Sequence, residues 1–139
     1  MSGQFIGDVS PQQSRQGLIE DPRSVMIDVR TAAEWAYVGG PDLSDIGRRL
    51  LRIEWQSFPS GQRNPNFVEE VTGNGIPVET PVYLICRSGI RSRAAAQLLA
   101  ECGYTTYNVS DGFEGPLDAA GHRGALGGWK AEGLPWKQG

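Results

Sequence analysis

The stretch VYLICRSGIRS at residues 82–92 carries the strongest structural signal of the sequence. Its first four residues form a continuous apolar run, which is typical of a strand buried on both faces of a parallel sheet. Beyond the polar loop that starts at Cys86, apolar residues recur at helical spacing until Gly103 ends the pattern. These residues are Ala94, Ala95, Leu98, Leu99 and Cys102. The stretch therefore predicts a strand, a tight loop and a helix, with Cys86 at the carboxyl end of the strand.

Capping signals and short apolar runs predict further elements on both sides of this unit. Ser10 and Gln13 form a capping box around Pro11, and Thr31 and Glu34 form a second one. We expect one helix at 11–20, a second that begins after 31, and a third that follows a cap at 64–65 and includes 67–71. Strands are expected at 25–27, 51–55, 82–85 and 107–109. Because strands alternate with helices, the sequence predicts an α/β fold with a mainly parallel sheet.

Length and composition indicate one domain over residues 1–139, since 39% of the 139 residues are hydrophobic. The Gly-rich segment 111–139 is expected to be ordered by docking on that domain. A net charge of -3 without a basic stripe makes nucleic acid an unexpected partner. The sequence contains neither an apolar run long enough to cross a bilayer nor a signal-peptide pattern at its start. We therefore expect a soluble, cytoplasmic protein with no membrane partner.

The two cysteines have different expected roles. Cys86 and Cys102 are too few for a disulfide framework, and the helix between them, ~20 Å long, exceeds disulfide reach. Their spacing to the single histidine, His122, matches no zinc-site pattern, so no metal is expected. Cys102 follows the apolar stripe of the helix and is predicted to lie in the core. His122 lies in the Gly-rich segment and is not expected to reach the site.

Cys86 is placed to act as a nucleophile. It precedes a helix whose first N–H groups lack backbone partners, and Arg87 and Arg91 are close in the chain. Such surroundings lower a cysteine pKa from ~8.5 to roughly 3.5–7.5 and give a thiolate at neutral pH. Gly89 allows the loop to curl so that its N–H groups form an anion-binding nest. The predicted catalytic residue is Cys86, and the predicted substrate-binding residues are Arg87, Ser88, Gly89, Ile90, Arg91 and Ser92.

Four stretches of the sequence resemble the rhodanese homology domain, and the resemblance covers nearly the whole chain. They are IDVR at 27–30 with Glu34-Trp35, the loop at 86–92, DGFEG at 111–115, and Gly128-Trp129 with GLPW at 133–136. In this family the loop has six residues from the cysteine through the arginine, as in 86–91, whereas related tyrosine phosphatases have one more. The resemblance implies a sheet of about five strands flanked by helices on both faces. One departure is the sequence GGPDL at 39–43, where many members have Gly-His-Ile-x-Gly-Ala.

The resemblance also implies a double-displacement reaction. Cys86 would take the outer sulfur of thiosulfate, a persulfide or a polysulfide and pass it to a small-molecule or protein thiol, without a metal or organic cofactor. Arg87 and Arg91 would hold the anionic donor. Two alternatives remain open: a non-catalytic anion-binding or redox-sensing module, and a phosphatase or arsenate reductase that uses the same loop.

Several other polar and aromatic residues are expected to be structural. Asp28 and Arg30 are predicted to form an ion pair at a strand end, and Glu34 to cap its helix. Trp129 and Trp136 are predicted to anchor the C-terminal segment on the domain.

Overall fold

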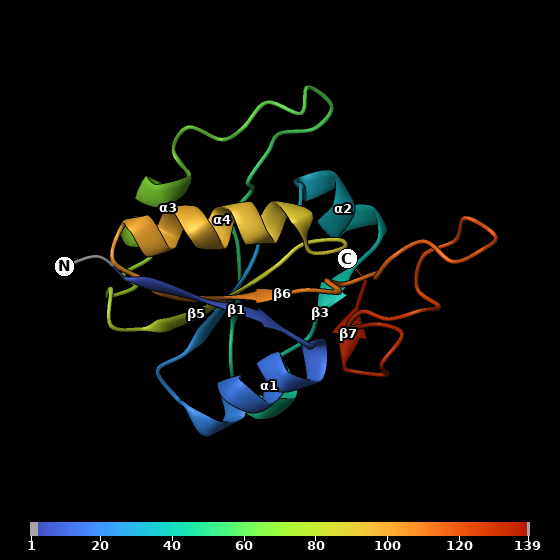
Figure 1. Ribbon diagram of the computed structural model, residues 1–139, viewed down its shortest axis with the longest axis horizontal. Helices are drawn as coiled ribbons and strands as arrows, with labels where there is room; N and C mark the ends of the chain where they lie inside the picture. Colours follow the sequence, from blue (N-terminus) through green and yellow to red (C-terminus); the bar gives the residue numbers. More distant parts are fainter. Residues whose placement is uncertain (1–2, 139) are drawn as a thin grey trace.

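A parallel sheet of five strands, in the order β1-β6-β5-β2-β4, forms the centre of the protein (Figure 1). The computed structural model describes residues 3–138. The strands are β1 Gln4–Val9, β2 Val25–Asp28, β4 Leu50–Arg52, β5 Pro81–Ile85 and β6 Thr105–Val109. A short antiparallel pair of β3 Gly40–Pro41 and β7 Trp136–Lys137 lies apart from this sheet. The predicted α/β class and the parallel sheet are confirmed.

Helices cover both faces of the sheet, as expected. In Figure 1, α1 Pro11–Glu20 lies on one face, and α2 Ala32–Tyr37, α3 Phe67–Gly73 and α4 Ile90–Glu101 lie on the other. A 3-10 helix, η1 Ser44–Ile46, precedes β4. Both predicted capping boxes are present: Ser10 Oγ accepts from the Gln13 N–H at 3.0 Å, and Thr31 Oγ1 accepts from the Glu34 N–H at 3.3 Å.

Alternate residues of the central strands pack on opposite faces of the sheet. Val82, Leu84 and Cys86 belong to the core beneath α3 and α4, whereas Tyr83 and Ile85 belong to the core beneath α1. This alternation follows from the period of two in a strand, and burial of both faces explains the continuous apolar run. It also determines that the Cys86 side chain lies on the same face as α4.

Two sequence predictions of element positions need correction, and some strands were missed. The strand expected at 51–55 is Leu50–Arg52, although the N–H groups of Ile53 and Trp55 still donate to the carbonyls of Asp28 and Val29, each at 3.1 Å. The helix expected behind 64–65 begins two residues later, because Asn64 Oδ1 accepts from the Asn66 N–H instead of from a helical N–H. Strand β1 and the β3–β7 pair were not predicted.

Cys102 does not lie in the core, contrary to the prediction. It is the exposed residue that ends α4. The buried residues of this helix are Ser92, Ala95, Ala96, Leu99 and Ala100. The true stripe is thus displaced by one residue from the predicted one, which corresponds to about 100° of rotation about the helix axis. That rotation turns the end of the predicted stripe to solvent.

Candidate active site

The candidate site lies at the carboxyl ends of β2 and β5, which are neighbours in the sheet. In open α/β sheets, ligands bind beyond these strand ends. Residues 86–89 form a tight loop that connects β5 to the first turn of α4. Cys86 is 1% exposed, so its thiol is almost completely enclosed by this loop and the neighbouring elements.

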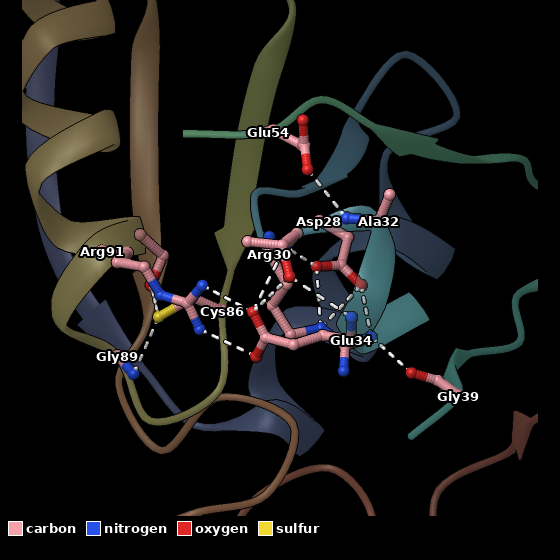
Figure 2. A network of polar contacts seen from close by, with 11 residues as sticks. Asp28, Arg30, Ala32, Glu34, Gly39, Glu54, Cys86, Gly89 and Arg91 are labelled. Carbon is pink, nitrogen blue, oxygen red and sulfur yellow. Dashed lines mark hydrogen bonds and ion pairs between the residues drawn. The ribbon is translucent and has the colours of Figure 1, made fainter. Parts of the chain in front are cut away.

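One backbone N–H of the loop and one hydroxyl of α4 contact the Cys86 sulfur (Figure 2). The Gly89 N–H donates to Sγ at 3.1 Å, and Ser92 Oγ lies 3.2 Å from it. Gly89 has a φ of +101°, and a Cβ at this position would lie 2.0 Å from the Ser110 carbonyl oxygen. The glycine is therefore required both by its backbone conformation and by the close approach of residue 110.

Asn108 on β6 holds the loop in place, and sequence reasoning did not identify it. Its Oδ1 lies 2.5 Å from Ser92 Oγ, and its Nδ2 donates to the Gly89 carbonyl at 3.1 Å and to Asp8 Oδ1 at 2.9 Å. Asn108 is 2% exposed. A buried amide that satisfies several groups rigidifies its surroundings, so Asn108 orients the residues that contact sulfur. A polar residue inside a predicted strand is the only sequence signal that pointed to it.

Arg91 makes an ion pair that the sequence did not reveal. Its Nη1 and Nη2 donate to Glu34 Oε1 and Oε2 at 2.6 and 2.9 Å, and both side chains are 20% exposed. The same carboxylate caps α2, since Glu34 Oε1 accepts from the Thr31 N–H at 3.1 Å. The cap was predicted, whereas the contact with Arg91 was not. The guanidinium assigned to donor binding is thus already paired with a carboxylate.

This pair perturbs the titration of both partners. Burial raises the pKa of Glu34, but the hydrogen bonds from Arg91 and Thr31 and the nearby guanidinium charges outweigh burial and lower the pKa below its usual value. The hydrogen bond to Glu34 raises the pKa of Arg91. The pair therefore remains ionised under ordinary conditions, and its net charge is zero.

Asp28 and Arg30 form the buried ion pair that was predicted. Both side chains are fully buried; Arg30 Nη2 donates to Asp28 Oδ2 at 2.8 Å and to the Gly39 carbonyl at 2.6 Å. The Arg30 guanidinium also lies 4.6 Å from the ring centroid of Phe113. The pair thus joins β2, the chain after α2 and the C-terminal segment. Figure 2 shows its contact with Gly39. It has no exposed surface with which to meet a substrate.

Arg87 and Arg91 line a cleft of about 530 Å³, whereas Cys86 is not among the lining residues. One wall comes from the segment 31–38, a second from the segment 56–61, and Arg87, Arg91 and Glu114 complete the lining. Arg87 is exposed, and among residues 3–138 its guanidinium has no hydrogen-bond or ion-pair partner. Of the other predicted loop residues, Ser88 is half-buried and Ile90 is 79% exposed, so the Ile90 side chain faces solvent.

The C-terminal segment borders the loop. The N–H groups of Phe113 and Glu114 donate to the carbonyls of Cys86 and Arg87 at 2.8 and 2.9 Å. Trp129 is fully buried and its Nε1 donates to the Pro135 carbonyl at 2.6 Å. Trp136 is 39% exposed and packs edge-on against Phe113. These contacts fix the backbone on which Cys86 and Arg87 stand.

His122 lies in an exposed turn of the C-terminal segment, where its N–H donates to Asp118 Oδ1 at 2.8 Å. Within residues 3–138, no group of three or more histidine, cysteine, aspartate or glutamate side chains could hold a metal ion. Over the same residues, no helix is long and apolar enough to span a bilayer.

Comparison with known proteins finds relatives that cover nearly the whole chain. The crystal structure of Rv0390 from M. tuberculosis is 50% identical, with a TM-score of 0.90 over 98% of this chain and 100% of that one. The polysulfide-sulfur transferase homodimer from Wolinella succinogenes is 26% identical, with a TM-score of 0.64 over 95% of this chain and 78% of that one. The thiosulfate sulfurtransferase GlpE of Actinobacillus pleuropneumoniae is 28% identical over 129 residues, covering 92% of this chain and 90% of the relative. A family model described as a rhodanese-like domain matches residues 10–118, and the chain therefore belongs to the rhodanese-like family.

Proposed function

We propose that the protein is a sulfurtransferase that carries a sulfane sulfur on Cys86 as a persulfide. The observation that carries this proposal is the Cys86 sulfur at a strand end, contacted by the Gly89 N–H and by Ser92, and followed in the chain by Arg87, which lines a cleft. Two relatives of the chain are named for transfer of sulfur from thiosulfate or polysulfide, which supports the same chemistry here.

The reaction consists of two displacements at sulfur. The Cys86 thiolate attacks the outer sulfur of the donor, a bond forms between the two sulfurs, and the donor's S–S bond breaks. With thiosulfate the leaving group is sulfite, which departs with the bonding electron pair. In the second step a nucleophile such as a thiolate or cyanide attacks the outer sulfur of the persulfide and regenerates the Cys86 thiolate. The transferred sulfur keeps its oxidation state throughout, so no external oxidant or reductant is consumed.

The groups around the sulfur have distinct tasks in this scheme. The Gly89 N–H stabilises negative charge on Cys86 before attack and after release, and Ser92 Oγ contacts the same sulfur. Asn108 fixes the positions of both. Because Cys86 is 1% exposed, bulk water is largely excluded from the reacting sulfur. Arg87, exposed at the cleft, is available to an anionic part of the donor.

Intact-protein mass spectrometry tests this proposal. The protein is incubated with excess thiosulfate, and in parallel with polysulfide, and then treated with cyanide. We expect a gain of one sulfur atom that cyanide removes as thiocyanate. Cys86→Ser should abolish the gain, whereas Cys102→Ser should retain it, because Cys102 is exposed at the far end of α4. Failure of both donors to load the wild-type protein, or equal loading of Cys86→Ser, would refute the proposal.

A further inference from the structure

We infer that the preferred sulfur donors of this site are organic persulfides with an apolar body and a carboxylate, rather than the inorganic dianion thiosulfate. This inference rests on the sulfurtransferase function proposed above and concerns the substrate class of the same site. Three features of the cleft lead to it: its charge, its size and lining, and the position of its one unpaired cation.

The charge of the cleft does not suit a dianion beside Cys86. Its charged lining consists of Arg87, Arg91, Glu34 and Glu114, two cations and two carboxylates. Arg91 is held by both of its terminal nitrogens on Glu34, so its charge is compensated before any ligand arrives. The Cys86 thiolate adds a further negative charge. Thiosulfate carries its two negative charges on the reacting sulfur and on the adjoining sulfonate oxygens. Both charges would be repelled by the Cys86 thiolate.

An organic persulfide avoids this repulsion. In its protonated form, R–S–SH, the reacting sulfur is uncharged when the Cys86 thiolate attacks it. The Cys86–S bond forms, the donor's S–S bond breaks, and RS⁻ leaves with the electron pair and takes up a proton from water. The proton on the outer sulfur stays with the new Cys86 persulfide until that persulfide ionises. Only one negative charge is present at the reacting sulfurs during the step.

The size and lining of the cleft fit an organic body. Its volume of about 530 Å³ lies within the range of ~300–1,000 Å³ that is usual for sites of organic ligands. Phe58, which is 70% exposed, lines the cleft together with Ala33 and Val38. Burial of an exposed aromatic side chain by a ligand is favourable. Thiosulfate has no apolar surface to offer to these side chains.

Arg87 supplies the recognition of the carboxylate. Within residues 3–138 it is the lining cation whose side chain has no partner, in contrast to Arg91. A guanidinium matches a carboxylate with two parallel hydrogen bonds. Because Arg87 directly follows Cys86, a donor that places its reacting sulfur at Cys86 also brings its body near Arg87. A carboxylate at a distance from the sulfur can therefore bind without opposing the thiolate.

Three donors test the inference on the whole 139-residue chain: thiosulfate, benzyl persulfide and para-carboxybenzyl persulfide. The rate of Cys86 persulfide formation is followed by quenched-flow mass spectrometry, and each rate is divided by that of the same donor with a free thiol in the same buffer. This normalisation removes the intrinsic reactivity of the donors. We expect the normalised rate of para-carboxybenzyl persulfide to exceed that of thiosulfate by at least about tenfold. It should also exceed the rate of benzyl persulfide by about fivefold, a ratio that one partly exposed ion pair can supply.

Two variants locate the causes. Arg87→Gln should bring the ratio of carboxylated to plain benzyl persulfide close to one, whereas the matched control Arg23→Gln, at the opposite end of the sheet, should leave that ratio unchanged. Glu34→Gln removes the compensating charge but keeps a residue that can complete a capping box, so the thiosulfate rate should rise about tenfold relative to benzyl persulfide.

The outcomes separate the two proposals. If no donor loads Cys86, sulfur transfer itself fails and the donor class fails with it. If thiosulfate loads the wild-type protein as fast as the persulfides after normalisation, or if Arg87→Gln leaves the ratio intact, the inferred donor class is wrong while the sulfurtransferase proposal stands.

Discussion

Replacement of Gly112 by alanine should distort the loop at 86–89, although Gly112 is not part of that loop. Gly112 has a φ of +65°, and a Cβ there would lie 2.5 Å from the Cys86 carbonyl oxygen and 2.6 Å from the carbonyl carbon and oxygen of Arg87. Side chains cannot relieve this overlap, because all three atoms belong to the backbone. Either the C-terminal segment or the backbone of Cys86 and Arg87 must move.

The size of the effect can be estimated from two separate contributions. An alanine in the left-handed region costs about 1 kcal/mol. Overpacking against a fixed backbone adds about 1–3 kcal/mol. Gly47→Ala provides a matched control: its φ is +70°, but nothing lies within 4 Å of the added Cβ. Gly112→Ala should therefore lose about 2 kcal/mol more stability than Gly47→Ala, in addition to the shared conformational cost.

Urea unfolding of both variants measures the stability difference, and the rate of Cys86 persulfide formation measures the effect on the site. We expect that rate to fall by one to two orders of magnitude in Gly112→Ala, since misplacement of reacting groups by about 1 Å has effects of this order. Equal losses of stability in the two variants would refute the steric argument. If Gly112→Ala is destabilised but forms the Cys86 persulfide as fast as Gly47→Ala, the C-terminal segment packs on the loop without positioning it.

Two further predictions concern ion pairs. The pKa of folded Glu34 lies below its usual value of 4.5, so its ionisation contributes stability that is complete above about pH 4.5 and is lost as the pH falls through the folded pKa. Melting temperatures measured between neutral pH and pH 3 should therefore fall more steeply for the wild type than for Glu34→Gln, and parallel curves would contradict this. Asp28→Asn leaves the Arg30 charge buried without its counter-ion, which should cost about 3–5 kcal/mol in chemical unfolding. Asp45→Asn breaks a surface pair and should cost far less, so similar losses would rule out the proposed cause.

The elements that sequence predicted well have local signals. The capping boxes at Ser10 and Thr31 involve residues three positions apart, and the unit of strand, loop and helix around Cys86 is continuous in the chain. In such cases the residues that determine the structure are adjacent to the residues that adopt it. The position of Cys86 at a strand end therefore followed from the sequence without knowledge of the fold.

The missed elements depend on partners far away in the chain. Strand β1 pairs only with β6, about one hundred residues later, and Gly7 and Asp8 interrupt its apolar pattern. An edge strand can tolerate such residues because one of its sides is free. Asp8 nevertheless accepts a hydrogen bond from Asn108, so the missed strand supports the loop. The short apolar run around β4 likewise gave wrong bounds: the strand begins one residue before the predicted range 51–55 and ends three residues before the end of that range.

The pairing of Arg91 with Glu34 shows why the site was only partly predictable. The two residues are 57 positions apart, and they meet because β2 and β5 are neighbours whose carboxyl ends lie at one edge of the sheet. The order of strands is a global property that local patterns do not determine. The sequence placed Cys86 and both arginines at a strand end and the loop that follows it, but it could not tell which arginine was already neutralised.

The identity of residue 34 has a consequence for both stability and substrate choice. A capping box accepts glutamine as well as glutamate, so capping of α2 does not by itself require a charge. The carboxylate is needed for the second contact, because only an anion cancels the charge of Arg91 while it fixes the guanidinium with two hydrogen bonds. One side chain therefore sets the start of a helix, the orientation of Arg91 and the net charge of the candidate site. It follows that Glu34→Gln should separate these roles: the helix start is kept, the stability gained at higher pH is lost, and the donor preference moves towards thiosulfate.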